Sequence, residues 1–268
     1  GPPDGPPVRR EADGDGWRAL ADLAGSLLAA RPSMGVVENR LDRAMATASE
    51  AATAAAVETA ASEGIDRAVA ADEQAAAAAA QALPERIATL SRSGTVRAAI
   101  EQANPDAVLV AESRPGREGV GVAERLAEDG DASVTLTTDA AFPAELRQFE
   151  AGALVVGADR VLPDGRVVNK VGTHGSALAA RAAGIPCYVV AASDKVTTDG
   201  AVDREERDPT AVYDGSASLA AVNPTFDVTP ADAVTAVVTE RGVLSADGIE
   251  AVAEEHRRRA AWRTDHVR

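Results

Sequence analysis

Residues 153–186 read ALVVGADRVLPDGRVVNKVGTHGSALAARAAGIP, and the organisation of the whole chain follows from them. The apolar run Ala153–Val156 has the length of a strand that is buried on both faces. Asp159 comes at the point where that strand would end. The turn signal Pro-Asp-Gly then leads into a short extended piece over 166–168, which Asn169-Lys170 follows.

A helix and another strand complete this stretch. Thr173 is suited to the N-cap of a helix over 174–183, because its hydroxyl oxygen can accept a hydrogen bond from a backbone N–H. Gly184 and Pro186 are typical of a helix end, and residues 187–192 predict the next buried strand.

Several polar groups of this stretch are expected to converge at one edge of a sheet. The carboxyl ends of neighbouring parallel strands meet at the same edge of a sheet. The predicted elements place four groups at this edge: Asp159, Asn169, Lys170 and the helix start at Gly172. An ammonium group and a helix N-terminus favour phosphate. The sequence therefore predicts a site for a phosphorylated small molecule that bears hydroxyl groups.

The rest of the chain divides into a helical part and a part in which strands and helices alternate. Apolar residues at helical spacing and an alanine-rich run predict helices over residues 17–83. Short apolar runs predict strands at 87–90, 107–111, 133–137, 153–156, 187–192 and 226–228. Such alternation implies a parallel, doubly wound sheet.

We therefore predict an α/β fold of three regions. Residues 1–16, rich in proline, glycine and charge, are expected to be a disordered tail. Residues 17–84 form a helical domain, and residues 85–268 form a Rossmann-like domain around the doubly wound sheet. Its last segment contributes a helix in which His256 is expected to be exposed.

Composition restricts the classes of partner and compartment. The chain of 268 residues carries 42 acidic and 27 basic residues, a net charge of −15, which disfavours direct nucleic-acid binding. Its acid excess and its two lysines suggest a halophilic protein. A single cysteine excludes an internal disulfide and favours the cytoplasm. We expect no membrane span, because no apolar run approaches about 20 residues.

Two blocks of sequence identify a resemblance to a known family. The pattern GADRV…DG…NKVGTH…A…GIPCYVVA and the segment NPTFDVTPADAVTAVVTERG at 223–242 resemble the translation initiation factor 2B α/β/δ subunits. The same family includes the methylthioribose-1-phosphate and ribose-1,5-bisphosphate isomerases. The resemblance implies a site in the cleft between the helical and sheet domains. It also implies a homodimer or a larger homo-oligomer, with a protein partner as a further option.

The resemblance assigns roles to several residues. Asp159 matches the catalytic aspartate of the isomerases, and Asn169 with Lys170 matches the pair that holds their substrate. From the residues alone, Asp159 is either a general acid or base or a loop-capping aspartate. Lys170 is either a phosphate ligand or a solvated lysine. No His/Cys cluster and no dinucleotide fingerprint is present, so we predict neither a metal nor a cofactor.

Arginines supply two more candidate phosphate contacts. Arg31, with Ser33, falls where the family has its first phosphate-side loop. Arg114, within the Glu-Ser-Arg-Pro segment at 112–115, resembles the ribose-1,5-bisphosphate isomerase branch and is a candidate for holding a second phosphate. A surface arginine after a helix is the alternative for Arg31.

One loop departs from the isomerases. Ser91 aligns with their catalytic cysteine and Leu90 with the histidine that precedes it. A thiol, with a pKa of about 8.5, is easily tuned to carry a proton, whereas an unassisted serine hydroxyl is a poor base. Cys187 lies within a predicted strand and reads as a small buried apolar residue. His174, beside the predicted helix start, either replaces the missing proton carrier or caps the helix.

Three functions remain open from the sequence. The first is an initiation-factor-2B-like protein that binds a phosphorylated sugar or nucleotide in a retained isomerase-type pocket. The second is an active sugar-phosphate isomerase that converts ribose 1,5-bisphosphate to ribulose 1,5-bisphosphate, with Asp159 and Ser91 as catalytic residues. The third is a structural subunit of a hetero-oligomer.

Overall fold

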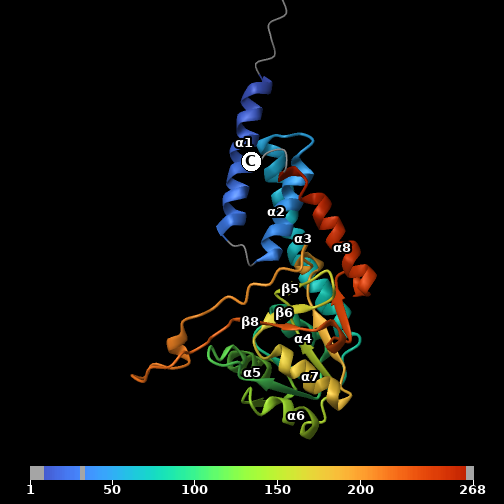
Figure 1. Ribbon diagram of the computed structural model, residues 1–268. Helices are drawn as coiled ribbons and strands as arrows, with labels where there is room; N and C mark the ends of the chain where they lie inside the picture. The colour runs from blue at the N-terminus through green and yellow to red at the C-terminus, as the bar shows by residue number, and fades with distance from the viewer. Residues whose placement is uncertain (1–8, 31–33, 264–268) are drawn as a thin grey trace, which may run out of the picture.

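The computed structural model describes residues 9–30 and 34–263 (Figure 1). The helices are α1 Arg9–Ala30, α2 Gly35–Ala48, α3 Ala54–Ala80, α4 Gly94–Ala103, α5 Glu118–Asp129, α6 Phe142–Gln148, α7 Thr173–Ala183 and α8 Ala246–Arg259. The strands are β1 Arg86–Leu90, β2 Ala107–Ala111, β3 Ser133–Thr137, β4 Ala153–Val156, β5 Arg160–Val161, β6 Val167–Lys170, β7 Cys187–Val190, β8 Phe226–Thr229, β9 Ala236–Thr239 and β10 Gly242–Leu244.

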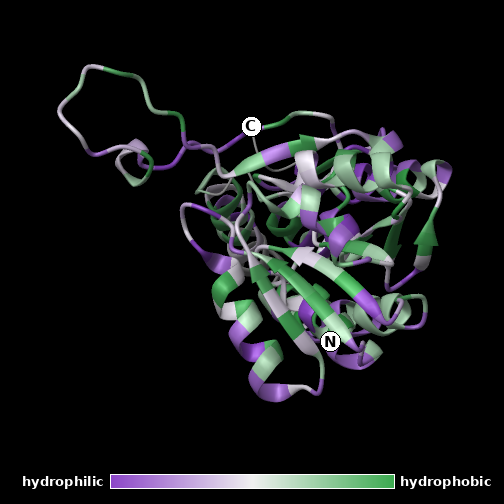
Figure 2. Ribbon diagram, turned by 90° about the horizontal axis from the view of Figure 1, so that it is seen from below, coloured by the Kyte–Doolittle hydropathy of each residue, from purple (hydrophilic) through white to green (hydrophobic). Residues whose placement is uncertain are grey.

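The main sheet confirms the predicted doubly wound architecture. Within the described residues it has seven strands in the order β10-β9-β7-β4-β1-β2-β3, all parallel except β10, which runs antiparallel to β9. Neighbouring residues of one strand enter different cores: Ile87 packs with α3, α4 and α5, and Ala88 packs with α6 and α7. The central strands are therefore buried on both faces, as their continuous apolar sequences require. Figure 2 shows those strands coloured largely as hydrophobic.

A second, smaller sheet was not predicted. β5, β6 and β8 pair antiparallel in the order β5-β6-β8, so the strand expected at 226–228 lies outside the main sheet. The main sheet instead continues through β9 and β10, which sequence reasoning missed. Strand pairing depends on tertiary partners more than on local propensity, and a four-residue apolar run does not specify which sheet it joins.

The N-terminal helices form a layer above the main sheet (Figure 1). α1 begins at Arg9, within the segment 1–16 that was predicted to be a disordered tail, and residues 1–8 lie outside the described part. Trp17, Ala21 and Ala24 of α1 are buried, and once these packed turns are helical, each further residue adds a backbone hydrogen bond at little cost. The alanines of α3 pack closely: Ala75, Ala76 and Ala79 are at most 1% exposed.

α8 joins the helical layer to the sheet. Ile249 and Val252 enter the core beside the sheet, while Trp262 beyond the helix donates its indole N–H to Asp42 of α2 at 2.9 Å. His256 lies between these contacts, fully buried, with its Nε2 atom 3.2 Å from the Ser193 carbonyl oxygen. The prediction that His256 is exposed is therefore wrong, because α8 is covered on the face that carries it.

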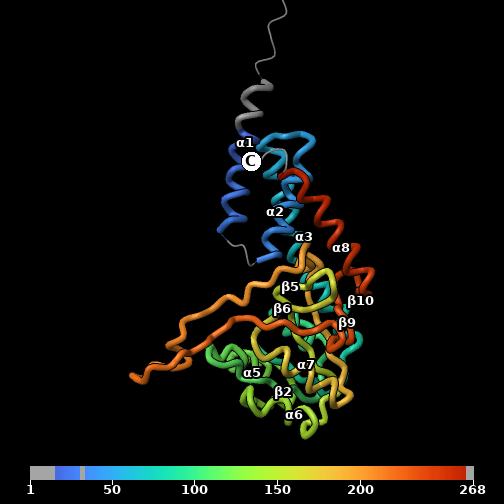
Figure 3. Tube along the Cα trace, viewed as in Figure 1, coloured from blue at the N-terminus to red at the C-terminus, as the bar shows by residue number. Residues whose placement is uncertain are grey.

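A long loop between β7 and β8 extends away from the rest of the molecule. Residues 201–220, which we call the arm, are exposed throughout, and Figures 1 and 3 show them extending away from both sheets. The two sides of its base approach each other through a bridge between Glu206 and Pro224 and a hydrogen bond from the Arg207 N–H to the Asn223 oxygen. The arm base therefore lies beside the second sheet.

A substitution at Gly119 tests the close contact between the start of α5 and the end of β2. A Cβ atom at Gly119 would lie 1.9 Å from the Ala111 carbonyl oxygen, so an alanine there forces the helix start away from the strand end. We expect Gly119→Ala to lower the free energy of unfolding by about 2–3 kcal/mol in chemical denaturation. Gly121→Ala in the same helix is the matched control. No atom lies within 4 Å of its Cβ position, and it should raise stability by about 0.5–1 kcal/mol. Equal effects of the two variants would contradict the contact.

Candidate functional site

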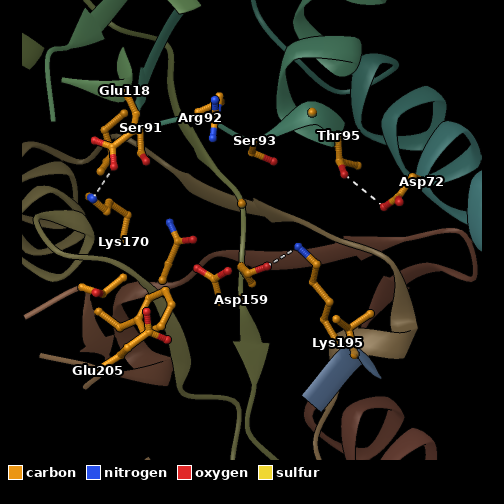
Figure 4. A pocket seen from close by; sticks show the side chains of 18 of the residues that line it. Asp72, Ser91, Arg92, Ser93, Thr95, Glu118, Asp159, Lys170, Lys195 and Glu205 are labelled. Atoms are coloured by element: carbon orange, nitrogen blue, oxygen red, sulfur yellow. Dashed lines mark hydrogen bonds and ion pairs between the residues drawn. The ribbon is translucent and has the colours of Figure 1, made fainter. Parts of the chain in front are cut away.

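A cavity of about 570 Å³ opens where the ends of β1 and β4 face the second sheet and the arm base. Such a volume falls in the range of small-molecule sites. Four residues proposed from the sequence line it, namely Ser91, Asp159, Asn169 and Lys170. Its other polar lining includes Arg40, Asp72, Arg92, Ser93, Thr95, Glu118, Lys195, Glu205, Arg207 and Thr225. Figure 4 shows many of these side chains pointing into one space.

Asp159 lies just beyond β4, as the sequence predicted. Its backbone N–H donates to the Val168 oxygen of β6 at 2.9 Å, which ties the end of β4 to the second sheet. The residue is open to the solvent of the cavity, but the cavity walls displace part of the surrounding water. This partial burial raises the pKa of the Asp159 carboxyl above its usual value, against the attraction of Lys195. A carboxyl of this kind can take up and return a proton.

Lys170 is buried and already has an anionic partner. Its Nζ atom donates to Oε1 of Glu118 at 2.6 Å, and Nη1 of Arg207 lies 3.4 Å from the same oxygen. Burial raises the pKa of Glu118, but the hydrogen bond and charge of Lys170 outweigh it, so the pKa of Glu118 is lowered. Glu118 is therefore a carboxylate that an incoming anion must displace from Lys170. Glu118 could not be identified from local sequence, because its partner lies 52 residues away.

The start of α7 does not face this cavity, contrary to the prediction for Gly172. The Gly172 N–H donates to Oδ2 of Asp227 at 2.7 Å, and the His174 N–H donates to the same carboxylate at 3.1 Å. Gly172, with φ of +106°, is itself the N-cap, and Thr173 is the first helical residue rather than the cap. Asp227 from β8 occupies the helix N-terminus, which local sequence around Gly172 cannot reveal.

Asn169, which also lines the cavity, and His174 make hydrogen bonds that support the loop before α7. Asn169 donates its amide N–H to Oγ1 of Thr173 at 3.0 Å, and Thr173 donates to the Lys170 carbonyl oxygen at 2.7 Å. The Nδ1 atom of His174 lies 2.5 Å from the Val228 oxygen, and His174 does not line the cavity. The alternative that His174 replaces a missing proton carrier in this cavity therefore has no geometric support.

Arg114 is also outside the cavity, and Arg31 and Ser33 lie outside the described residues. Oδ1 and Oδ2 of Asp139 accept the N–H groups of Ser113 and Arg114 at 2.8 and 2.5 Å, which fixes the loop against the end of β3. The Arg114 side chain is exposed, with its Nε atom 3.3 Å from Glu112. Its predicted role in holding a second phosphate is not supported by this placement.

The loop after β1 brings a different helix start to the cavity. Ser91 has φ of +62°, which turns the chain sharply at the end of the strand. Ser93 then caps α4 by accepting the Val96 N–H at 3.3 Å, so the first residues of α4, Gly94 and Thr95, line the cavity beside Arg92. Gly157 permits this approach, because a Cβ there would lie 2.8 Å from the Ser93 hydroxyl.

No thiol or imidazole reaches the cavity from the described residues. Cys187 is buried in β7, and burial raises its pKa to about 12, which agrees with its interpretation as a small apolar residue. Burial also lowers the pKa of His256, which lies behind Ser193. Among the described residues no group of three or more His, Cys, Asp or Glu is arranged to hold a metal ion. None of the helices in that part has the length and apolar character of a membrane span.

Comparison with known sequences identifies a matching family model and similar curated proteins. The family model described as "Initiation factor 2 subunit family" matches residues 9–246. The methylthioribose-1-phosphate isomerase of Syntrophotalea carbinolica is 39% identical over 171 residues, which cover 60% of this chain and 49% of that protein. The corresponding protein of Heliobacterium modesticaldum is 41% identical over 162 residues, covering 56% and 47%. The chain thus spans about half the length of these curated relatives.

Solved structures show the same fold. A translation initiation factor eIF-2B of Pyrococcus horikoshii OT3 superposes with a TM-score of 0.75 at 30% identity, covering 87% of this chain and 83% of that one. The 5-methylthioribose 1-phosphate isomerase of the same organism gives a TM-score of 0.65 at 25% identity, covering 81% and 69%. Both a translation factor and an isomerase are therefore similar in structure to this chain.

Proposed function

The chain belongs to the initiation factor 2 subunit family, and we propose that it binds a phosphorylated sugar or nucleotide in this cavity without efficient turnover. The observation that carries the proposal is the joint lining by Asp159, Asn169 and Lys170 in a space of about 570 Å³. These groups match a ligand that has a phosphate at one end and hydroxyl groups at the other.

The phosphate is proposed to lie between Lys170 and the start of α4. Arg92 makes no ion pair with any described residue, and it stands beside the N–H groups of the first turn of α4, which attract anions. Displacement of Glu118 frees Lys170 for the same phosphate. The hydroxyl groups of the sugar then reach Asp159 and Asn169.

The absence of efficient turnover is proposed from the side chains that line the cavity. An aldose–ketose isomerisation moves a hydrogen between neighbouring carbons and needs two groups that handle protons. Asp159, with its raised pKa, fits one role. Ser91 stands at the second position, and a serine hydroxyl without an adjacent base is a weak proton acceptor.

A sugar-phosphate isomerase is the second candidate. The relatives named methylthioribose-1-phosphate isomerase, at 39–41% identity, favour it, and so does the raised pKa of Asp159. Under this alternative Asp159 is the acid or base and Ser91 an unusual second group, with methylthioribose 1-phosphate or ribose 1,5-bisphosphate as substrate.

Binding is the first prediction of this function. Calorimetry with ribose 1,5-bisphosphate and with methylthioribose 1-phosphate should show saturable binding of at least one compound. Lys170→Ala should weaken that binding by about 10- to 100-fold, the value of a lost charge-assisted hydrogen bond. Glu118→Gln should strengthen it severalfold, because the amide competes less well for Lys170.

Arg181→Ala is the matched control, because Arg181 pairs with Asp232 at the exposed end of α7, away from the cavity. It should leave the affinity unchanged. Absence of binding for both compounds, or binding that Lys170→Ala does not alter, would contradict the proposal and favour a purely structural subunit.

We further propose that the protein forms a homodimer or a larger homo-oligomer through the arm. The apolar side chains of Val212 and Leu219 are each 55% exposed on the arm, which packs against little of its own chain. A second copy that covers them is expected to bury this surface. In sedimentation velocity the wild type should therefore run as a dimer or larger. Val212→Asp/Leu219→Asp should dissociate it, whereas Ile65→Asp, at a 66% exposed site on α3, should not. A monomeric wild type would overturn this proposal.

A further inference from the structure

A second polar cavity, of about 420 Å³, lies on the other side of Asp194 from the first. Four arginines line it, and each comes from a different part of the fold: Arg43 from α2, Arg67 from α3, Arg241 from the turn between β9 and β10, and Arg259 from α8. Figure 1 shows α2, α3 and α8 running beside one another at this place. Asp194 and Glu240 are the acidic residues of its lining.

The acidic groups around this cavity are already engaged. Asp194 accepts from both terminal nitrogens of Arg43, with Nη1 at 3.1 Å. Glu240 accepts the Ser193 N–H at 2.8 Å and the Ser193 hydroxyl. Glu255 pairs with Arg241 at 2.7 Å and with Arg259. The carboxylates therefore do not satisfy all the guanidinium N–H groups that surround the cavity.

Two buried N–H positions remain without a partner. They are Nε of Arg43, whose residue is only 9% exposed, and Nη1 of Arg259. An unsatisfied, buried, charged donor costs free energy, and an anion is the partner that best removes that cost. Arg67 stands exposed at the edge of the same cavity and makes no ion pair with any described residue.

The guanidinium groups also repel one another. Four guanidinium groups line this one cavity. Burial and then the charge of Arg43 lower the pKa of Arg259, as expected for neighbouring cations. The chain as a whole carries a net charge of −15, whereas the lining of this cavity has four arginines and two acidic residues. The cavity is therefore positively charged within an acidic protein. An oxyanion bound between the guanidinium groups would relieve their repulsion and would also accept hydrogen bonds from the unpartnered N–H groups.

We propose that this second cavity binds a small oxyanion, of the class of inorganic phosphate or a phosphate monoester, through Arg43, Arg67 and Arg259. The planar guanidinium group offers paired N–H donors that match the oxygens of phosphate. The site is separate from the cavity that contains Asp159 and Lys170, and no residue lines both. Asp194 links the two sites, because it lines the second cavity and also accepts a hydrogen bond from Arg40 of the first cavity.

The experiment uses inorganic phosphate as the probe and the Lys170→Ala variant of the full chain as the background. Lys170→Ala weakens the first cavity, so phosphate that still binds reports on the second one. A calorimetric or ³¹P NMR titration at fixed chloride concentration should show saturable binding of one phosphate for each chain. Arg67→Gln and Arg259→Gln, each added to this background, should weaken it by about tenfold or more.

Arg258→Gln is the matched control, because Arg258 is the exposed neighbour of Arg259 on α8 and lines neither cavity. It should leave phosphate binding unchanged. Arg67 makes no ion pair with a described residue, so Arg67→Gln keeps the test valid even if Arg259→Gln unfolds the protein. No saturable binding, or binding that Arg67→Gln leaves intact or that Arg258→Gln weakens equally, would overturn the proposal.

Discussion

The buried carboxylate of Asp194 holds the helical layer against the main sheet, and both cavities depend on it. It is only 2% exposed and accepts hydrogen bonds from Arg43 and Arg40 of α2. Burial raises its pKa, but these two guanidinium groups outweigh that effect and keep the pKa lowered, so the carboxylate stays charged. Asn39 strengthens the joint by donating to the carbonyl oxygens of Asp194 and Val196 at 2.8 and 2.7 Å. A buried charge of this kind is tolerated only when its partners remain in place.

The same turn places a functional group on each side of the joint. Asp194 belongs to the 3₁₀ turn η1, Ser193–Lys195, directly after β7. Lys195 reaches the first cavity from this turn and donates to the Ala158 oxygen at 2.5 Å, next to Asp159. Asp194, on the opposite side of the turn, lines the second cavity and holds Arg43 there. One short connection at the carboxyl edge of the sheet therefore positions groups in both cavities, as the topology of open parallel sheets favours.

Sequence reasoning succeeded where local patterns decide the structure. The runs at 107–111 and 153–156 are buried strands with the predicted bounds, because continuous apolar segments of that length are recognisable from the chain alone. The strand at 133–137 also has the predicted bounds, although it lies at the sheet edge and is not buried. Asp159 and Ser91 meet in one cavity because parallel strands end at the same edge. The errors come from contacts between distant segments. Glu118 reaches Lys170, and Asp227 occupies the start of α7, through pairings that no local pattern records.

The fold by itself does not decide between a ligand-binding subunit and an isomerase, because one fold hosts both kinds of relative. We propose that Ser91, which lines the same cavity as Asp159, decides between them. The direct measurement is ³¹P NMR of ribose 1,5-bisphosphate and of methylthioribose 1-phosphate mixed with the wild-type protein. For a ligand-binding subunit, we expect the phosphorus signals of a bound compound to shift or broaden in a saturable way while no ketose product accumulates. Steady product formation that Asp159→Asn abolishes would contradict this expectation and establish an isomerase.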